Sequence, residues 1–118
     1  MQDLIKLRKE IHQNPELSGF EKETAKRVIN FIEPLGPDEI ITNVGGDGIL
    51  VVFNGTAPGK TILIRAELDA LPIQEINMFD YKSVTENVSH KCGHDGHATI
   101  LCGLAKKLSS DRPQKGRI

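Results

Sequence analysis

The sequence has little of several features that define common protein classes. Its two cysteines, Cys92 and Cys102, are too few for a disulfide framework, so a reducing compartment such as the cytoplasm is the predicted setting. The longest apolar run, residues 49–53, is far too short to cross a membrane, and the N-terminus lacks the apolar core of a signal peptide. Acidic and basic residues nearly balance, 16 against 15, which gives no reason to expect nucleic acid or an anionic membrane as a partner.

Two amphipathic helices are predicted before residue 37. The first ends near Asn14, because Pro15 disfavours helix in the residue before it. The second starts after Ser18, which has the spacing of a capping box with Glu21, and it stops at Gly36. Their apolar stripes are Leu4, Leu7 and Ile11 in the first helix and Ala25, Val28, Ile29, Ile32 and Leu35 in the second.

The pattern after residue 38 is that of strands. Residues 39–44, 49–53 and 61–66 have strand length and β-branched content, and we expect the last two to pair antiparallel through the loop between them. A final helix is predicted from about Gly96 to Ser109, with Asp95 as its N-terminal cap. Residues 67–92 are predicted to be irregular, and residues 114–118 look like the approach to another strand. This order predicts an α/β fold with a mixed central sheet flanked by helices.

One ten-residue stretch, SHKCGHDGHA at 89–98, holds three of the four histidines. Cys92 and His94 are separated by one residue and can converge on a metal ion from an extended loop, with His97 as a third ligand or a support. Thiolate and imidazole suit zinc and its transition-metal neighbours, whereas carboxylates favour manganese. The alternative is that these are solvated loop side chains. Cys102 is predicted to be a core residue and His12 a structural one.

A second stretch, residues 63–75, places Glu67 and Asp69 just beyond a predicted buried strand, where α/β proteins build their sites. Because the two carboxylates are two residues apart near the end of a strand, we expect only one to point at the site. The alternative is that both are solvated charges at a strand end.

RAELDALPIQE at 65–75, followed by HKCGHDGHATILCGLAKKL at 90–108, resembles the two N-terminal signatures of the M20 metallopeptidase-like amidohydrolases. The resemblance is to the branch that acts on N-acyl amino acids, hippurate and auxin conjugates. It implies a zinc-exopeptidase-like catalytic domain with Cys92 and His94 as metal ligands and Asp69 as the catalytic-site carboxylate behind them. Asp95 and His97 would then have supporting and helix-capping roles, and His90 belongs to the same loop.

The resemblance also implies that residues 1–118 are a truncated part of the catalytic domain. Family members have a Glu-Glu pair, further histidine ligands and a lid or dimerisation domain after the strand that KGRI begins, and this sequence reaches Ile118 before them. The implied activity is hydrolysis of the amide bond of a small N-acyl amino acid or peptide-like substrate. The implied cofactor is a pair of divalent ions, zinc, manganese, nickel or cobalt.

Two expectations follow for the isolated 118 residues. We expect them to be inactive alone, and to self-associate or pair with the missing portion through incompletely covered strands. The alternative function is a non-catalytic metal-binding or interaction module derived from the same fold. A thiol redox protein is disfavoured because Cys92 has no C-x-x-C partner.

Overall fold

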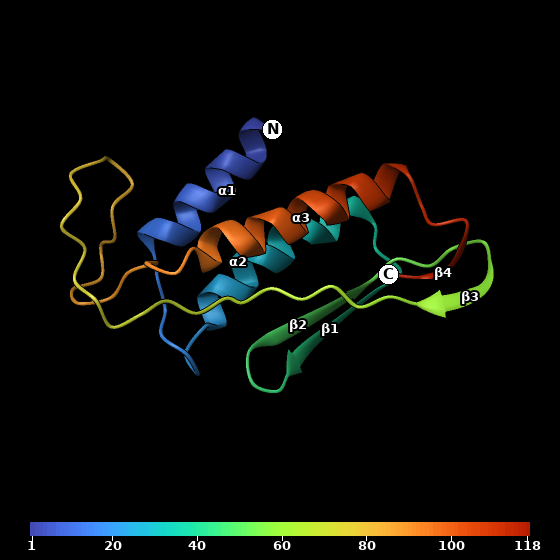
Figure 1. The fold of residues 1–118 in the computed structure, drawn as a ribbon, viewed down its shortest axis with the longest axis horizontal. Coiled ribbons are helices and arrows are strands. Elements are labelled where there is room, and N and C mark those ends of the chain that lie inside the picture. The colour runs from blue at the N-terminus through green and yellow to red at the C-terminus, as the bar shows by residue number, and fades with distance from the viewer.

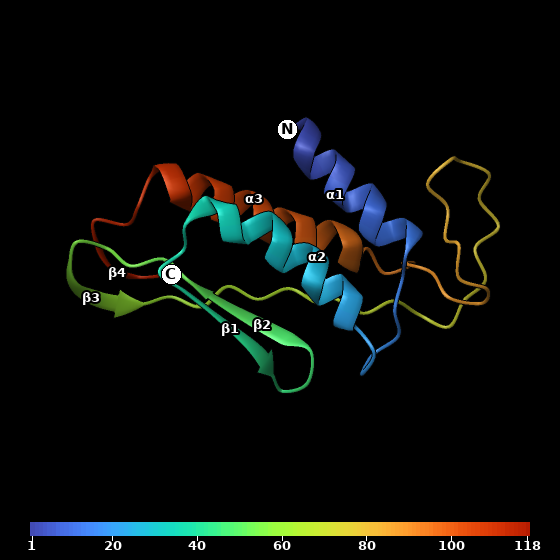
Figure 2. The same ribbon diagram turned by 180° about the vertical axis from the view of Figure 1, so that it is seen from behind.

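Three helices form one layer of the molecule in the computed structural model, which describes residues 1–118. They are α1 (Gln2–Gln13), α2 (Lys22–Ile32), which continues into the short 3-10 helix η1 (Glu33–Leu35), and α3 (His94–Ser110). The last helix lies alongside the other two in both views (Figures 1 and 2). Their apolar faces share one core, made of Leu7, Ile11, Val28, Ile32, Phe53, Ala98, Cys102, Ala105 and Leu108. The predicted helices are confirmed.

The start of α2 differs from the predicted capping box. Ser18 makes no capping hydrogen bond, and the N-cap position is taken by Glu21 without a side-chain cap. The carboxylate of Glu16 instead accepts hydrogen bonds from the main-chain N–H groups of Glu23 (3.2 Å) and Thr24 (2.6 Å) and from the Thr24 hydroxyl (2.7 Å). A residue outside the local motif therefore satisfies the free N–H groups of the first turn.

The four strands form two small sheets. Strand β1 (Glu39–Val44) pairs antiparallel with β2 (Gly48–Val52), and β3 (Ala57–Thr61) pairs parallel with β4 (Lys115–Arg117). An antiparallel bridge between Asn54 and Arg117 connects the two sheets. The α/β class and the mixed strand directions are confirmed, as is the short strand predicted at the end of the sequence.

The expected strand at residues 61–66 and its pairing with 49–53 are wrong. Only Thr61 lies in a strand; Ile62 still donates one main-chain hydrogen bond to Arg117, and residues 63–66 run on in extended form without strand partners. The reason is that β4 takes the intervening position: Phe53 exchanges two main-chain hydrogen bonds with Ile118, at 2.9 and 3.0 Å. The apolar segment consequently stays uncovered, and Leu63 is 73% exposed.

The contact between β3 and β4 depends on glycine. Gly116 has a positive φ of 72°, and a Cβ atom there would lie 2.1 Å from the carbonyl oxygen of Lys60. Only a residue without a side chain permits this approach of the two backbones. None of the helices is long and apolar enough to cross a membrane.

Candidate metal centre

The N-terminus of α3 presents the histidine motif. The helix begins at His94, two residues earlier than predicted, because Gly93 takes the N-cap position with a φ of 93°. Asp95 is therefore not the cap but lies inside the first turn, with its side chain buried. His94 and His97 are one turn apart and so project from the same side of the helix.

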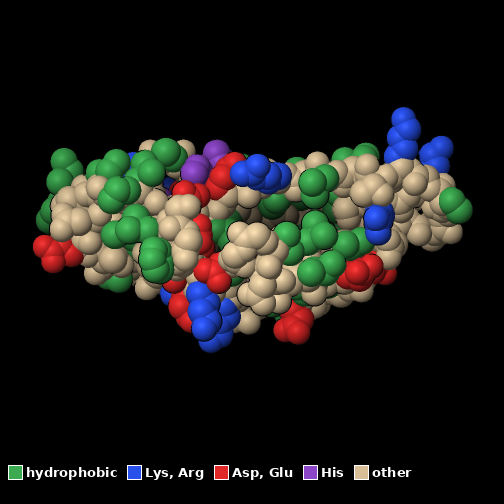
Figure 3. Space-filling view, turned by 90° about the horizontal axis from the view of Figure 1, so that it is seen from below, with side chains coloured by type: hydrophobic (Ala, Val, Ile, Leu, Met, Phe, Trp, Pro, Cys, Tyr) green, Lys and Arg blue, Asp and Glu red, His purple; other side chains and the backbone are tan.

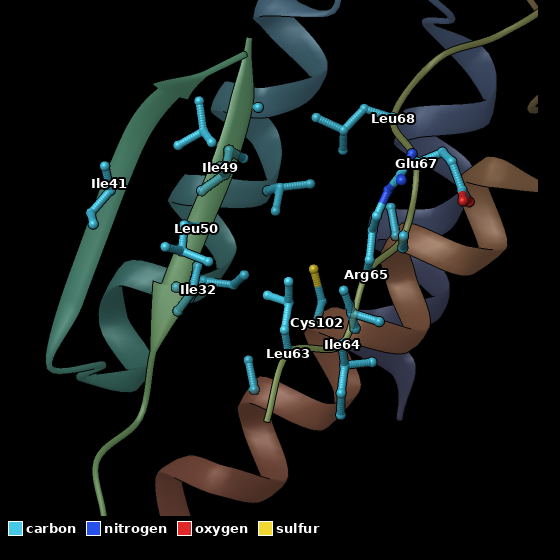
Figure 4. Close-up of a pocket in the computed structure, with 18 of the residues that line it drawn as sticks. Ile32, Ile41, Ile49, Leu50, Leu63, Ile64, Arg65, Glu67, Leu68 and Cys102 are labelled. Carbon is cyan, nitrogen blue, oxygen red and sulfur yellow. The ribbon is translucent and has the colours of Figure 1, made fainter. Parts of the chain in front are cut away.

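Three side chains converge at this helix end. The potential ligand atoms of Glu67, His94 and His97 all lie within 4.8 Å of one another. Glu67 comes from the extended segment after β3, which passes the first turn of α3 (Figure 4). Figure 3 shows histidine beside acidic side chains at the edge of a hollow with hydrophobic walls. Two imidazoles and one carboxylate are a donor set that fits a divalent transition-metal ion.

His94 is oriented by Asp69. Its Nδ1 lies 2.9 Å from the main-chain carbonyl oxygen of Asp69 and 3.0 Å from the carboxylate oxygen Oδ1. Both partners are acceptors, so Nδ1 carries a proton and Nε2 is the ring nitrogen left to face a metal ion. A carboxylate behind a histidine in this way fixes the ring and raises its basicity toward a metal.

His97 is paired with Glu67. Its Nδ1 lies 3.1 Å from Oε2 of Glu67, and this hydrogen bond is the main reason that the pKa of Glu67 is held below its usual range. The two acidic residues thus contact one histidine each, which contradicts the expectation that only one of Glu67 and Asp69 points at the site. Residues two apart along an extended segment project from the same face, so the spacing itself allows both carboxylates to reach the helix end.

Cys92 is not among the converging residues. Its free thiol is exposed, and Gly93 separates it from the helix. Of the predicted ligand pair, the structure brings His94 into the group and leaves Cys92 next to it in sequence but outside it. Glu67 and His97 complete the group instead.

A buried network of charges supports the helix end from behind. Nδ1 of His12 lies 2.8 Å from Oδ2 of Asp95, which also accepts from Nε of Arg8 at 2.8 Å. Although burial acts to raise the pKa of Asp95, the hydrogen bond from His12 and the charge of Arg8 hold that pKa below its usual value. On its other side, Nε2 of His12 lies 3.1 Å from Glu75. The structural role predicted for His12 is confirmed.

Glu75 was missed by sequence reasoning. Its carboxylate is 1% exposed and also accepts from Lys91 (2.7 Å), Asn77 (2.8 Å) and the N–H of Ser83 (2.6 Å). Burial opposes its ionisation, yet these donors hold the pKa of Glu75 far below its usual range. No spacing rule identifies such a residue, because its partners come from three separate parts of the chain.

Two further residues of the motif region are buried. Cys102 is fully enclosed in the core, and burial raises the pKa of its thiol to about 12, which confirms its predicted core role. His90 is also buried, and neither of its ring nitrogens has a hydrogen-bond partner. Burial is the main cause that lowers the pKa of His90, so its ring is neutral at neutral pH.

A cluster of two histidines and a carboxylate at the end of a helix in an α/β fold fits the class of metal-binding proteins. No model of a protein family matches the sequence. The chain is 40% identical over 110 residues to the N-acyl-L-amino acid amidohydrolase of Geobacillus stearothermophilus, covering 93% of this chain and 30% of that protein. It is 45% identical over 105 residues to the hippurate hydrolase of Campylobacter jejuni, covering 89% of this chain and 27% of that protein.

A solved structure agrees with these relatives. The YxeP protein of Bacillus subtilis, described as a dinuclear metal-binding peptidase from the M20 family, superposes with a TM-score of 0.89 at 36% identity. The match covers 94% of this chain and 31% of the other. Over most of its length the chain is therefore similar to part of these amidohydrolases and of an M20 peptidase, in agreement with the resemblance of its motifs, and it spans about 30% of the length of the relatives it matches.

Proposed function

We propose that residues 1–118 are the metal-binding part of a catalytic domain that hydrolyses the amide bond of N-acyl amino acids or similar conjugates. The convergence of Glu67, His94 and His97 within 4.8 Å carries this proposal. The names of the relatives, an N-acyl-L-amino acid amidohydrolase and a hippurate hydrolase, support the substrate class. The free thiols of Cys92 and Cys102 are consistent with a cytoplasmic location.

The proposed ligands are Cys92 and His94, extended by Glu67 and His97. A divalent ion, zinc, manganese, nickel or cobalt, would supply a polarised carbonyl and a bound water of lowered pKa. His94 would bind through Nε2 because Asp69 holds its Nδ1 proton, and this orienting contact is the role we propose for Asp69. Cys92 would bind as a thiolate.

A further part of the proposal concerns completeness. The relatives are described as hydrolases over lengths about three times that of this chain. We propose that further ligands, the general base and a lid or dimerisation domain come from outside residues 1–118. The 118-residue chain alone should then bind metal more weakly than a complete site and release no product from N-acetyl or N-benzoyl amino acids. Turnover by the purified chain that a chelator removes and added metal restores would contradict this division of the site.

A cobalt titration tests the ligand set. Co²⁺ added to the purified chain should give visible bands of a histidine-containing site together with a near-ultraviolet band from cobalt–thiolate charge transfer. Glu67→Gln and His94→Ala should weaken binding at least about tenfold, because each removes a ligand or its charge. Glu39→Gln, an exposed change on β1, should bind cobalt like the unchanged chain.

The thiolate band separates the two cysteines. Cys92→Ser should abolish it, whereas Cys102→Ser should retain it, because a core thiol of pKa about 12 forms no thiolate at neutral pH. If the unchanged chain binds cobalt without a thiolate band, Cys92 is not a ligand and Glu67, His94 and His97 remain as the site. A band that survives Cys92→Ser would instead assign the thiolate to Cys102.

A further inference from the structure

The first turn of α3 carries two residues of the candidate metal centre but is weakly constrained by its own sequence. Gly93 takes the N-cap position, Gly96 lies inside the turn, and no side chain caps the helix. Glycine gives the backbone more freedom than any other residue, so this turn does not fix its own orientation. The directions of His94 and His97 must therefore be set by contacts from outside the helix.

Asp95 makes such a contact from within the same turn. Its side chain is 1% exposed, and its Oδ2 lies 2.8 Å from Nδ1 of His12 and 2.8 Å from Nε of Arg8. Both donors belong to α1, whose C-terminal end lies beside the start of α3 in both views (Figures 1 and 2). Helix α1 thus holds the first turn of α3 through one carboxylate oxygen.

His12 is itself fixed on its other sides. Its Nε2 lies 3.1 Å from Oε1 of Glu75, and its ring centroid lies 5.6 Å from those of both Phe79 and Tyr81. The imidazole is 5% exposed and lies between two buried carboxylates, so it has no alternative position. A displacement of Asp95 relative to α1 would leave both the carboxylate and the ring short of a partner.

Helix geometry converts this contact into ligand positions. At about 100° per residue, His94 and His97 project about 60° apart, and Asp95 projects about 100° from His94 on the other side. Side-chain atoms lie about 5–6 Å from the helix axis, so turning the first turn by about 10° moves the ring nitrogens by about 1 Å. Metal sites tolerate deviations of only about 0.2 Å in the distances to their ligands.

We propose that His12 is a positioning residue for the candidate metal centre. Through Asp95 it sets the rotation of the first turn of α3, and this rotation sets the directions of His94 and His97. The inference rests on the proposed function in taking these two histidines as ligands. The same rotation also places His94 at 2.9 Å from the carbonyl oxygen of Asp69, a contact that requires no metal ion.

Two variants, each with a matched control, test this role. His12→Gln keeps a polar side chain but donates from one end only, so it cannot serve both carboxylates. Arg8→Met removes the second donor to Asp95, and the half-exposed position of Arg8 makes it the milder change. Leu108→Ala destabilises the core at the far end of the same helix, and Lys6→Met changes an exposed residue of α1.

Co²⁺ titration gives the first readout. His12→Gln should weaken binding at least about tenfold and change the shape and intensity of the visible cobalt bands, because the ring nitrogens no longer converge as before. Arg8→Met should change the bands in the same direction, by less. Leu108→Ala should lower the melting temperature yet bind cobalt with the same bands as the unchanged chain, and so should Lys6→Met without the loss of stability. A purely structural His12 would lower the melting temperature and leave the bands of the folded protein unchanged.

NMR of the metal-free proteins gives the second readout. The ring ¹⁵N shifts of His94 and His97 report their hydrogen bonds to Asp69 and Glu67, and they should move in His12→Gln but not in the two controls. Unchanged affinity, bands and ring shifts in His12→Gln would overturn the proposal, as would equal changes in Leu108→Ala. If His12→Gln does not fold, Arg8→Met against Lys6→Met decides the question. An unchanged chain that binds no Co²⁺ would contradict the proposed function, and the ring shifts would still decide whether His12 orients the two histidines.

Discussion

The imidazole of His94 is held by two oxygens of one residue, the main-chain carbonyl and the carboxylate of Asp69, at 2.9 and 3.0 Å from Nδ1. The two residues are 25 positions apart, and the contact joins the extended segment after β3 to the first turn of α3. It fixes the direction in which Nε2 points before any ion arrives.

Asp69→Ala should weaken metal binding about tenfold while leaving the fold intact, because the carbonyl contact remains and only the carboxylate is lost. Isothermal titration with Zn²⁺ measures the affinity. Asp80→Ala is the matched control, since Asp80 is exposed and its side chain makes no hydrogen bond. Equal affinity for the two variants would show that the carboxylate does not orient His94.

His12→Leu should lower the free energy of unfolding by about 3 kcal/mol, because it leaves the carboxylates of Asp95 and Glu75 buried with fewer donors. Urea denaturation measures the loss. The exposed pair Lys6–Glu10, with 3.8 Å between its charged atoms, supplies the control: Glu10→Gln should change stability by less than about 0.5 kcal/mol. If His12→Leu lowers the free energy of unfolding as little as the control does, the network around His12 does not stabilise the fold.

Acid should destabilise the fold through Glu75 and Asp95. Both have a pKa in the folded state below that of the free side chain, 4.5 for Glu and 3.8 for Asp. Their contribution is therefore complete above about pH 5 and is lost as the pH falls below these values toward the folded pKa. The urea concentration at the midpoint of unfolding, measured from pH 7 to pH 3, should decrease steadily once the pH is below 5.

Lys91→Met should flatten this acid dependence, because Lys91 is the strongest donor that lowers the pKa of Glu75. Lys107→Met should not, although Lys107 lowers the pKa of Asp111, because that pair is exposed and screened by solvent. Identical profiles for the two variants would assign the acid dependence to other carboxylates.

Glu16→Ala should destabilise the protein by about 1–2 kcal/mol, the usual effect of losing a helix cap. Ser18→Ala should change stability very little, since Ser18 caps nothing in the structure. Thermal unfolding of the two variants distinguishes the observed cap from the sequence motif. A larger loss of stability for Ser18→Ala than for Glu16→Ala would show that Ser18, not Glu16, caps the helix.

The two thiols should differ in reactivity. Cys92 is exposed and should react with a thiol reagent in the folded protein, whereas Cys102, with a pKa of about 12 and no exposure, should react only after unfolding. Absorbance during reaction with an aromatic disulfide counts the thiols, one before denaturant and two after. Added Zn²⁺ should slow the reaction of Cys92 in the folded protein if Cys92 is a ligand.

Local signals in the sequence were sufficient for the helices and for the region of the site. Apolar spacing located the helices, and the density of His and Cys at 89–98 located two of the three residues of the candidate metal centre, His94 and His97. The failures concern partners that lie far away along the chain. The apolar run at 61–66 gave no sign that Ile118 would take its place beside Phe53, and the Ser18 motif gave no sign that Glu16 was better placed.

The site itself shows the same limit. Spacing singled out Cys92 and His94, but the pairing of Glu67 with His97 depends on how the extended segment passes α3, which no periodicity reports. Likewise, Glu75 became visible only when Lys91, Asn77 and Ser83 were seen around it.

The loop that protrudes from the end of the molecule has fixed ends (Figure 1). Leu71 and Ser89 exchange two main-chain hydrogen bonds of 3.0 Å at its base, and Glu75 binds the N–H of Ser83 further out. Residues 76–82 are thus a tip outside two successive closures, with Ile76 and Met78 more than four-fifths exposed. Asn77 donates to Glu75, and the rings of Phe79 and Tyr81 lie 5.6 Å from that of His12, so these three residues of the tip belong to the buried network. Closing a loop twice as long costs only about 0.6 kcal/mol more, so a peptide grafted at the exposed Ile76 or Met78 could change the loop without displacing Asp69 or His94.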